Sequence, residues 1–193
     1  MILIMDNGSQ YTHLIKRNCR DLGYDADVLN SKLETGELES ALKKSVEKII
    51  LSGGPSSVYS DPPNLSSEIC LRTKSGTLKF PLLGICYGQQ MIAHVWGAKV
   101  AKGKSAEYGT GEIVVDEEDA LFAGVPKKFR AWVSHFDEVK ELPGGFMALA
   151  HSETCAIEAM RHGDLPVFGV QFHPEVWHTE HGEQILRNFL ELR

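Results

Sequence analysis

The chain has 193 residues, of which 42% are hydrophobic and 24% are charged, a composition that excludes disordered, collagen-like and disulfide-scaffold proteins. Twenty Lys and Arg residues against 26 Asp and Glu residues give a formal net charge of −6, which leaves no broad cationic surface for nucleic acid or an anionic membrane. Apolar runs far shorter than the ~20 residues of a membrane helix, and four cysteines without a C-x-x-C pair, predict a cytoplasmic protein with one domain over residues 1–193 and no disulfide framework.

The first half of the chain alternates predicted strands and helices. The apolar run Met1–Met5 predicts a strand buried on both faces, and the helical spacing of apolar residues in Gln10–Leu22 predicts a helix after it. The alternation continues with strands over Ala26–Leu29, Val46–Leu51 and Pro81–Cys86, and with helices over Gly36–Ser45, Leu65–Thr73 and Tyr87–Trp96. Strands separated by helices predict an α/β fold with a doubly wound, mostly parallel sheet flanked by helices.

Beyond Gly97 the predicted structure is different. Short strand-like segments broken by Gly, Pro and Asp follow one another over Tyr108–Val115, Lys128–Val133, Phe146–Ala150 and Ala156–Arg161. We interpret them as a smaller β-rich excursion from the same domain. The chain then returns with an apolar strand over Val167–Phe172, and the helical stripe of Gly182–Leu192 predicts a final helix against the sheet.

A motif at the end of the predicted strand Pro81–Cys86 has the spacing of a nucleophile elbow. In Gly84-Ile85-Cys86-Tyr87-Gly88 the cysteine stands between two glycines, directly after a strand and directly before a helix, and the glycines allow the close chain approach that such a turn requires. The dipole and free N–H groups of the helix favour the thiolate, and the N–H of Tyr87 points to where an oxyanion would form. Cys86 is therefore a candidate nucleophile; the alternative is a structural cysteine in a βα turn.

A histidine and a glutamate follow another predicted buried strand. In Gln171-Phe172-His173-Pro174-Glu175, His173 lies directly after the strand, and Glu175 is close enough to reach the imidazole nitrogen that does not face the sulfur. Because the carboxyl ends of parallel strands share one edge of a sheet, Cys86 and His173 can meet although 87 positions separate them. Each alone is more simply a loop residue, so the combination carries the hypothesis of a Cys-His-Glu site.

Two further groups of residues have weaker patterns. Ser52-Gly53-Gly54-Pro55 also ends a buried strand, where a second backbone N–H could complement that of Tyr87; the alternative is a simple turn. His173, His178 and His181 are clustered, but neither H-E-x-x-H nor a carboxylate at a matching spacing accompanies them. We therefore expect no metal site in this chain.

Three motifs in this order resemble the class I glutamine amidotransferases, and the resemblance spans nearly the whole chain. They are Ser52-Gly53-Gly54-Pro55, Gly84-Ile85-Cys86-Tyr87-Gly88-Gln89-Gln90 and Gln171-Phe172-His173-Pro174-Glu175. Within the family the chain most resembles the glutaminase part of GMP synthases, because of three further segments: Asp6–Thr12, Trp132–Asp137 and Val176–Thr179. The resemblance implies a flavodoxin-like amidotransferase fold.

The resemblance also implies a role for particular residues. It implies that Cys86 is the nucleophile, His173 the base and acid, and Glu175 the residue that orients His173, with Gly54 and Tyr87 as oxyanion donors. Glutamine would be bound by Gly53, Gln90, Ser134, His135 and Asp137, with Trp177 over the pocket. It implies no cofactor in this chain, and ammonia delivery to a separate ATP pyrophosphatase subunit that uses Mg-ATP to convert XMP to GMP.

Other functions remain open at this stage. A class I glutaminase could serve a different acceptor, although Val176-Trp177-His178-Thr179 favours GMP synthase. A cysteine hydrolase of γ-glutamyl or peptide substrates would need the same Cys and His but no partner. A non-catalytic doubly wound binding module would leave the elbow glycines and the His-Pro-Glu motif unexplained.

Overall fold

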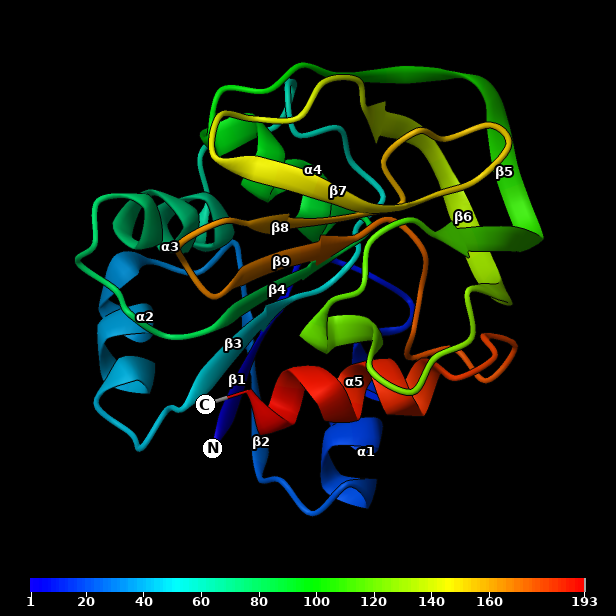
Figure 1. The fold of residues 1–193 in the computed structure, drawn as a ribbon. Helices are drawn as coiled ribbons and strands as arrows, with labels where there is room; N and C mark the ends of the chain where they lie inside the picture. The colour runs from blue at the N-terminus through cyan, green and yellow to red at the C-terminus, as the bar shows by residue number, and fades with distance from the viewer. Residues whose placement is uncertain (193) are drawn as a thin grey trace.

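The structure, a computed structural model, describes residues 1–192, apart from the side chains of residues 104 and 105. Its nine described strands form one sheet in the order β2-β1-β3-β4-β9-β8-β7-β5-β6 (Figure 1). Five strands, β1 (Ile2–Asp6), β2 (Ala26–Asn30), β3 (Lys48–Leu51), β4 (Leu82–Ile85) and β9 (Val167–Val170), pair in parallel. The predicted doubly wound parallel sheet is therefore confirmed.

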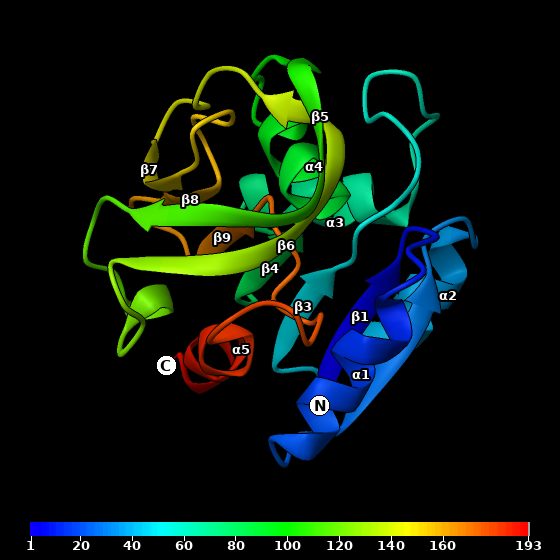
Figure 2. The same cartoon turned by 90° about the vertical axis from the view of Figure 1, so that its right-hand side faces the viewer.

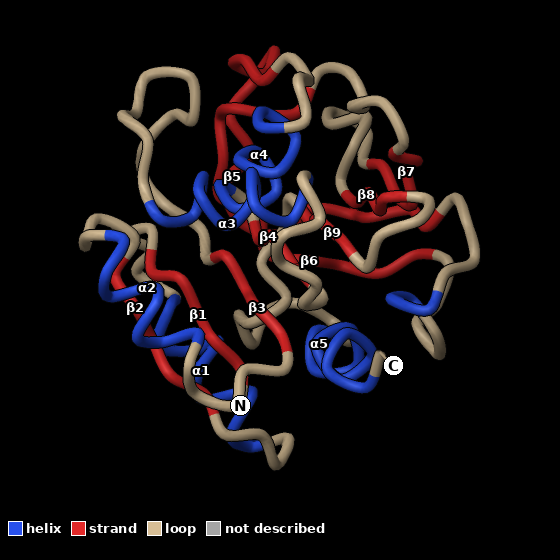
Figure 3. Tube along the Cα trace, turned by 90° about the vertical axis from the view of Figure 1, so that its left-hand side faces the viewer, coloured by secondary structure: helices blue, strands red, loops and turns tan. Residues whose placement is uncertain are grey.

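Helices cover both faces of the parallel strands, as Figure 3 shows. Successive side chains of a strand point to opposite faces, and in β1 Ile2 and Ile4 belong to one buried cluster whereas Leu3 and Met5 belong to the other. The first cluster contains residues of α1 (Thr12–Asp21) and α5 (Gly182–Glu191). The second contains residues of α2 (Thr35–Leu42), α3 (Leu65–Lys74) and α4 (Tyr87–Val95).

The strands of the β-rich excursion are hydrogen-bonded into the same sheet, and Figure 2 shows β5 and β6 in front of β4 and β9. The excursion consists of β5 (Val100–Val115), the short 3₁₀ turn η1 (Ala120–Phe122), β6 (Lys128–Val139), β7 (Phe146–His151) and β8 (Ala159–His162). All of its strand pairs are antiparallel, and β8 joins it to β9. The register shift between Lys102 and Glu107 interrupts the β5–β6 ladder.

The strand boundaries in this excursion correct the prediction. β5 begins at Val100 rather than Tyr108, β6 continues to Val139 rather than ending at Val133, and β8 begins at Ala159 rather than Ala156. A register shift breaks the period-2 alternation on which a strand prediction depends. The longer β5 and β6 carry one wall of the site described below. None of the described helices is both long enough and apolar enough to cross a bilayer.

Candidate active site

The turn between β4 and α4 holds Cys86 in a strained backbone conformation. Cys86 precedes the first residue of α4 and has φ 52° and ψ −106°, a positive φ that is uncommon for any residue except glycine. The two flanking glycines leave no room for a side chain: an added Cβ at Gly84 would lie 2.4 Å from the carbonyl oxygen of Gly88, and one at Gly88 would lie 2.4 Å from that of Leu51. The turn therefore has the geometry expected of a nucleophile elbow.

The end of β9 brings His173 beside Cys86. The parallel pairing of β4 with β9 continues into the turn, where the N–H of Cys86 donates to the carbonyl of Val170 at 2.8 Å. Gly53 packs against both catalytic candidates, since an added Cβ there would lie 3.0 Å from Cε1 of His173 and 3.7 Å from Cβ of Cys86. The sheet edge thus unites three segments that are far apart in the sequence.

Glu175 holds the imidazole from the other side. The Nδ1 atom of His173 and the Oε1 atom of Glu175 are 2.9 Å apart, and both side chains are buried. A carboxylate at Nδ1 fixes the tautomer and leaves Nε2 to face the sulfur. Burial on its own lowers the pKa of His173, but the carboxylate of Glu175 and the neighbouring Cys86 sulfur together raise the pKa well above its usual value. The raised pKa favours the protonated imidazolium of His173.

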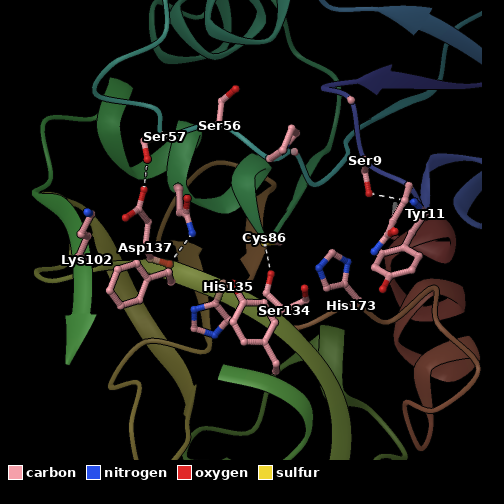
Figure 4. A pocket seen from close by; sticks show the side chains of 17 residues that line it. Ser9, Tyr11, Ser56, Ser57, Cys86, Lys102, Ser134, His135, Asp137 and His173 are labelled. Atoms are coloured by element: carbon pink, nitrogen blue, oxygen red, sulfur yellow. Dashed lines mark hydrogen bonds between the residues drawn. The ribbon is translucent and has the colours of Figure 1, made fainter. Parts of the chain in front are cut away.

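A cavity of about 620 Å³ opens in front of Cys86 and His173 (Figure 4). Seven of the residues to which the sequence analysis gave a catalytic or binding role line it: Gly54, Cys86, Gln90, Ser134, His135, Asp137 and His173. Gly53 and Tyr87 lie next to these residues, and Glu175 lies behind His173. The cavity is large enough for an amino acid of the size of glutamine, since ligand pockets of a few hundred Å³ hold small molecules.

The backbone near Gly54 and Tyr87 suits an oxyanion site. Gly54 lines the cavity, and an added Cβ there would lie 2.7 Å from the carbonyl oxygen of Asn7 and 3.3 Å from Cγ of Tyr87, so only glycine fits. Tyr87 is the first residue of α4, and the N–H groups of a first helical turn have no partner within the helix. The assignment of these two N–H groups as oxyanion donors remains a prediction.

Gln90 ties the helix behind the nucleophile to the opposite wall of the cavity. Its Nε2 donates to the carbonyl of Asp137 at 2.7 Å and to Oε1 of Gln171 at 3.1 Å. Both amide hydrogens are thus engaged within the protein, which leaves only Oε1 of Gln90 for a substrate. The carboxylate of Asp137 accepts hydrogen bonds from Ser57 and from Tyr59, the latter at 3.1 Å.

His135 is supported by a carboxylate that sequence analysis missed. Glu107 and His135 face each other across β5 and β6, and Oε2 of Glu107 lies 2.8 Å from Nε2 of His135. Although burial raises the pKa of Glu107, interactions with His135 and Thr154 outweigh it and lower the pKa below its usual value. Glu107 could not be found from the sequence, because the register shift that precedes it hides its cross-strand partner.

Trp177 does not lie over the pocket, which corrects the expectation from the resemblance. Its side chain is 84% exposed and packs against the ring of His178, with ring centroids 3.7 Å apart. The aromatic residue against His173 is Tyr11, at 5.0 Å between ring centroids and an interplanar angle of 71°. Trp132 supports Tyr11 by donating from Nε1 to the tyrosine oxygen at 3.1 Å. The turn after Glu175 directs Trp177 outward instead.

The side chains that the structure brings together as possible metal ligands are not the clustered histidines of the sequence analysis. Among the residues that the structure describes, the ligand atoms of Glu107, Cys155 and Glu158 come within 4.8 Å of one another, whereas those of the three clustered histidines do not form such a group. Burial raises the pKa of Glu158 to about 7 and raises that of Cys155 far above its usual value. Both groups therefore favour their neutral, protonated forms, which suit a cation poorly.

Comparisons with known proteins agree with this geometry. Residues 3–192 match the family model described as glutamine amidotransferase class-I. The chain is 50% identical over 192 residues to a Pyrococcus abyssi protein named as one subunit of a glutamine-hydrolyzing GMP synthase, a match that covers 100% of this chain and 98% of that protein. It is 43% identical over 189 residues to the glutamine-hydrolyzing GMP synthase of Thermosipho melanesiensis, covering 98% of this chain and 35% of that longer protein.

A solved structure shows the same fold. The crystal structure of a Thermoplasma acidophilum protein, described as a GMP synthase subunit, matches with a TM-score of 0.86 at 34% sequence identity, covering 98% of this chain and 91% of that one. The family match, the full-length relative and this structure agree with the elbow, the His-Glu pair and the cavity. The chain therefore belongs to the class I glutamine amidotransferase family.

Proposed function

We propose that this chain is the glutaminase subunit of a two-subunit GMP synthase. It hydrolyses glutamine to glutamate and delivers the ammonia to a separate ATP pyrophosphatase subunit, which uses Mg-ATP to convert XMP to GMP. The observation that carries the proposal is the placement of Cys86 and His173 at the wall of a cavity of about 620 Å³, with Glu175 paired to His173 behind that wall. The partner is proposed because full-length relatives are named as one subunit of GMP synthase, whereas in the Thermosipho protein the match covers a third of a longer chain.

Acyl transfer to sulfur is the first half of the proposed reaction. The thiolate of Cys86 attacks the side-chain carbonyl carbon of glutamine, and the negative charge moves to the carbonyl oxygen, which the N–H groups of Gly54 and Tyr87 stabilise. The imidazolium of His173 then protonates the amide nitrogen. The carbon–nitrogen bond breaks, ammonia leaves and a γ-glutamyl thioester remains on Cys86.

Hydrolysis of the thioester completes the cycle. Neutral His173 removes a proton from water as the oxygen attacks the thioester carbonyl, and Glu175 stabilises the imidazolium that forms. Collapse of the intermediate releases glutamate and restores the thiolate beside the imidazolium. Ammonia in bulk water at neutral pH is mostly protonated and no longer nucleophilic, so direct delivery to the acceptor subunit preserves its reactivity.

The Cys86→Ala variant tests this proposal in the complex with the ATP pyrophosphatase subunit. Glutamine-dependent GMP formation should fall by about 10³-fold or more, because the nucleophile acts as a unit with its base. Ammonia-dependent GMP formation should stay within about twofold of the wild type, since the chemistry on XMP belongs to the partner. A matched control is Cys70→Ala, which removes a buried thiol of α3 that does not line the cavity.

Glutamine-dependent and ammonia-dependent GMP formation together distinguish the proposed function from the alternatives. Glutamine-dependent synthesis that persists in Cys86→Ala would contradict the nucleophile assignment. Glutamine hydrolysis by the wild type with no transfer to XMP in any complex would instead support a cysteine hydrolase that acts alone or a glutaminase that serves another acceptor.

A further inference from the structure

One end of the cavity carries a pair of opposite charges. Lys102 and Asp137 are register partners on the adjacent strands β5 and β6, and both line the cavity. Among the described lining residues, Lys102 is the only Lys or Arg and Asp137 is the only carboxylate. Figure 4 shows Lys102 and Asp137 together on one side of Cys86, with His173 on the other side.

The two charged groups do not form an ion pair with each other. The carboxylate of Asp137 is oriented by hydrogen bonds from Ser57 and Tyr59. The ammonium of Lys102 forms no ion pair with any described residue and lies 5.5 Å from the centroid of the Phe136 ring. A cation over an aromatic face keeps its position while its N–H groups remain free for an anion.

The charged end lies at a suitable distance from the nucleophile. Gln90 is four residues beyond Cys86, about one helical turn of ~5.4 Å along α4, and its side chain reaches the backbone carbonyl of Asp137. Free glutamine has its reactive carboxamide at one end, and an α-ammonium and an α-carboxylate together at the other. The cavity matches this distribution, with Cys86 and His173 for the carboxamide and a carboxylate and an ammonium for the α-groups.

We propose that Lys102 binds the α-carboxylate of free glutamine and restricts the site to the free amino acid, so that glutamine within a peptide is excluded. This inference rests on the proposed glutaminase function and adds a specificity residue that the sequence motifs do not contain. A peptide-bound glutamine lacks the anion that Lys102 would receive, and its neutral carbonyl would leave the ammonium without a charged partner.

The test compares two substrates in the complex with the ATP pyrophosphatase subunit. One is L-glutamine, and the other is L-glutamine α-amide, in which the α-carboxylate is replaced by a neutral carboxamide. Mass spectrometry of the product deamidated at the side chain gives kcat and KM for each substrate. The variants are Lys102→Met, the charge-preserving Lys102→Arg, and the control Lys99→Met, which removes an exposed lysine that does not line the cavity.

The expected result is a change in KM specific to the α-carboxylate. Lys102→Met should raise KM for glutamine about 10- to 150-fold, the range of a hydrogen bond to a charged group, while kcat stays within about twofold and KM for the α-amide is unchanged. Lys102→Arg should restore most of the affinity, and Lys99→Met should behave as the wild type.

Two other results would contradict the inference, and they differ in what they leave standing. An unchanged KM for glutamine in Lys102→Met, or an equal rise for both substrates, would overturn the inference and leave the glutaminase function standing. A wild-type complex that hydrolyses no glutamine would overturn the proposed function itself, and the inference with it.

Discussion

His173 lies between the sulfur of Cys86 and the carboxylate of Glu175, and both neighbours favour its protonated form. Since its pKa is raised in the folded protein, this histidine contributes stability that is fully present below the ordinary imidazole pKa of about 6.5 and is lost as the pH rises through the raised value. The same proton is the one that the proposed reaction transfers to the departing amide nitrogen of glutamine. Glu175 is the partner of His173 that can be changed without removing the nucleophile.

The Glu175→Gln variant should lower the pKa of His173 and the rate together. An amide at 2.9 Å from Nδ1 carries no charge to stabilise the imidazolium, and it can present its NH₂ group, which favours the wrong tautomer. We expect kcat for glutamine hydrolysis to fall by about 10²- to 10⁴-fold, and NMR titration of the imidazole to show a lower pKa. Glu183→Gln on the exposed start of α5 is the control, and an unchanged imidazole titration in Glu175→Gln would contradict the role given to Glu175.

Sequence patterns predicted the chemical centre better than the walls of the cavity. Cys86 and His173 follow strands of the same parallel sheet, so chain order and the shared sheet edge were enough to bring them together. The walls depend on contacts between β5 and β6 and on loops whose course no periodicity reveals. Lys102 and Glu107 lie on either side of a register shift. Tyr11, and not Trp177, packs against the ring of His173.

At the level of elements, the elbow depends on close contact between β4, α4 and β3. Gly88→Ala would place a methyl group 2.4 Å from the carbonyl oxygen of Leu51, which is backbone and cannot move aside. We expect unfolding in denaturant to show a loss of stability of about 1–3 kcal/mol or more, with glutaminase activity reduced because Cys86 shifts.

The matched control for this substitution is Gly36→Ala in α2. Apart from its two chain neighbours and the backbone of its own helix, no heavy atom lies within 4 Å of the added Cβ. Alanine is the better helix former, so this variant should gain about 0.5–1 kcal/mol. If both alanine variants gave the same change in the free energy of unfolding, close packing at the elbow would not be what requires glycine.

The elements themselves were predicted well where hydrophobic periodicity is regular. The five described α-helices and the five described parallel strands lie where apolar runs and helical spacing placed them, with ends that differ by a few residues. The predicted lengths of β5 and β6 were too short. Polar residues such as Lys102 and Asp137 face the cavity, at positions where a strand over a closed core would carry apolar residues. The polar residues that line the cavity thus interrupt the alternation of apolar and polar residues from which strands are predicted.

At the scale of the whole molecule, one buried acid makes stability depend on pH. Glu158 is fully buried, and the groups near its carboxylate include Ser152, His135, Glu107 and Glu138. Burial raises its pKa to about 7, with His135 and Ser152 opposing that rise and the two neighbouring carboxylates adding to it. Because the unfolded chain releases this proton near pH 4.3, the folded state binds more protons between about pH 4 and 7, and the free energy of unfolding falls as the pH rises through that window.

Replacement of this acid by its neutral isostere should therefore remove much of the pH dependence. Glu158→Gln is expected to match the wild type within about 1 kcal/mol at pH 5 and to exceed it by about 2–3 kcal/mol at pH 8, an order of magnitude set by the width of the window. Urea unfolding at pH 5, 6, 7 and 8 measures this difference, with Glu117→Gln, an exposed acid at the surface, as the control. Parallel stability curves for Glu158→Gln and the wild type would mean that Glu158 is ionised in the folded protein, and the buried cluster behind His135 would then have to hold a second negative charge beside Glu107.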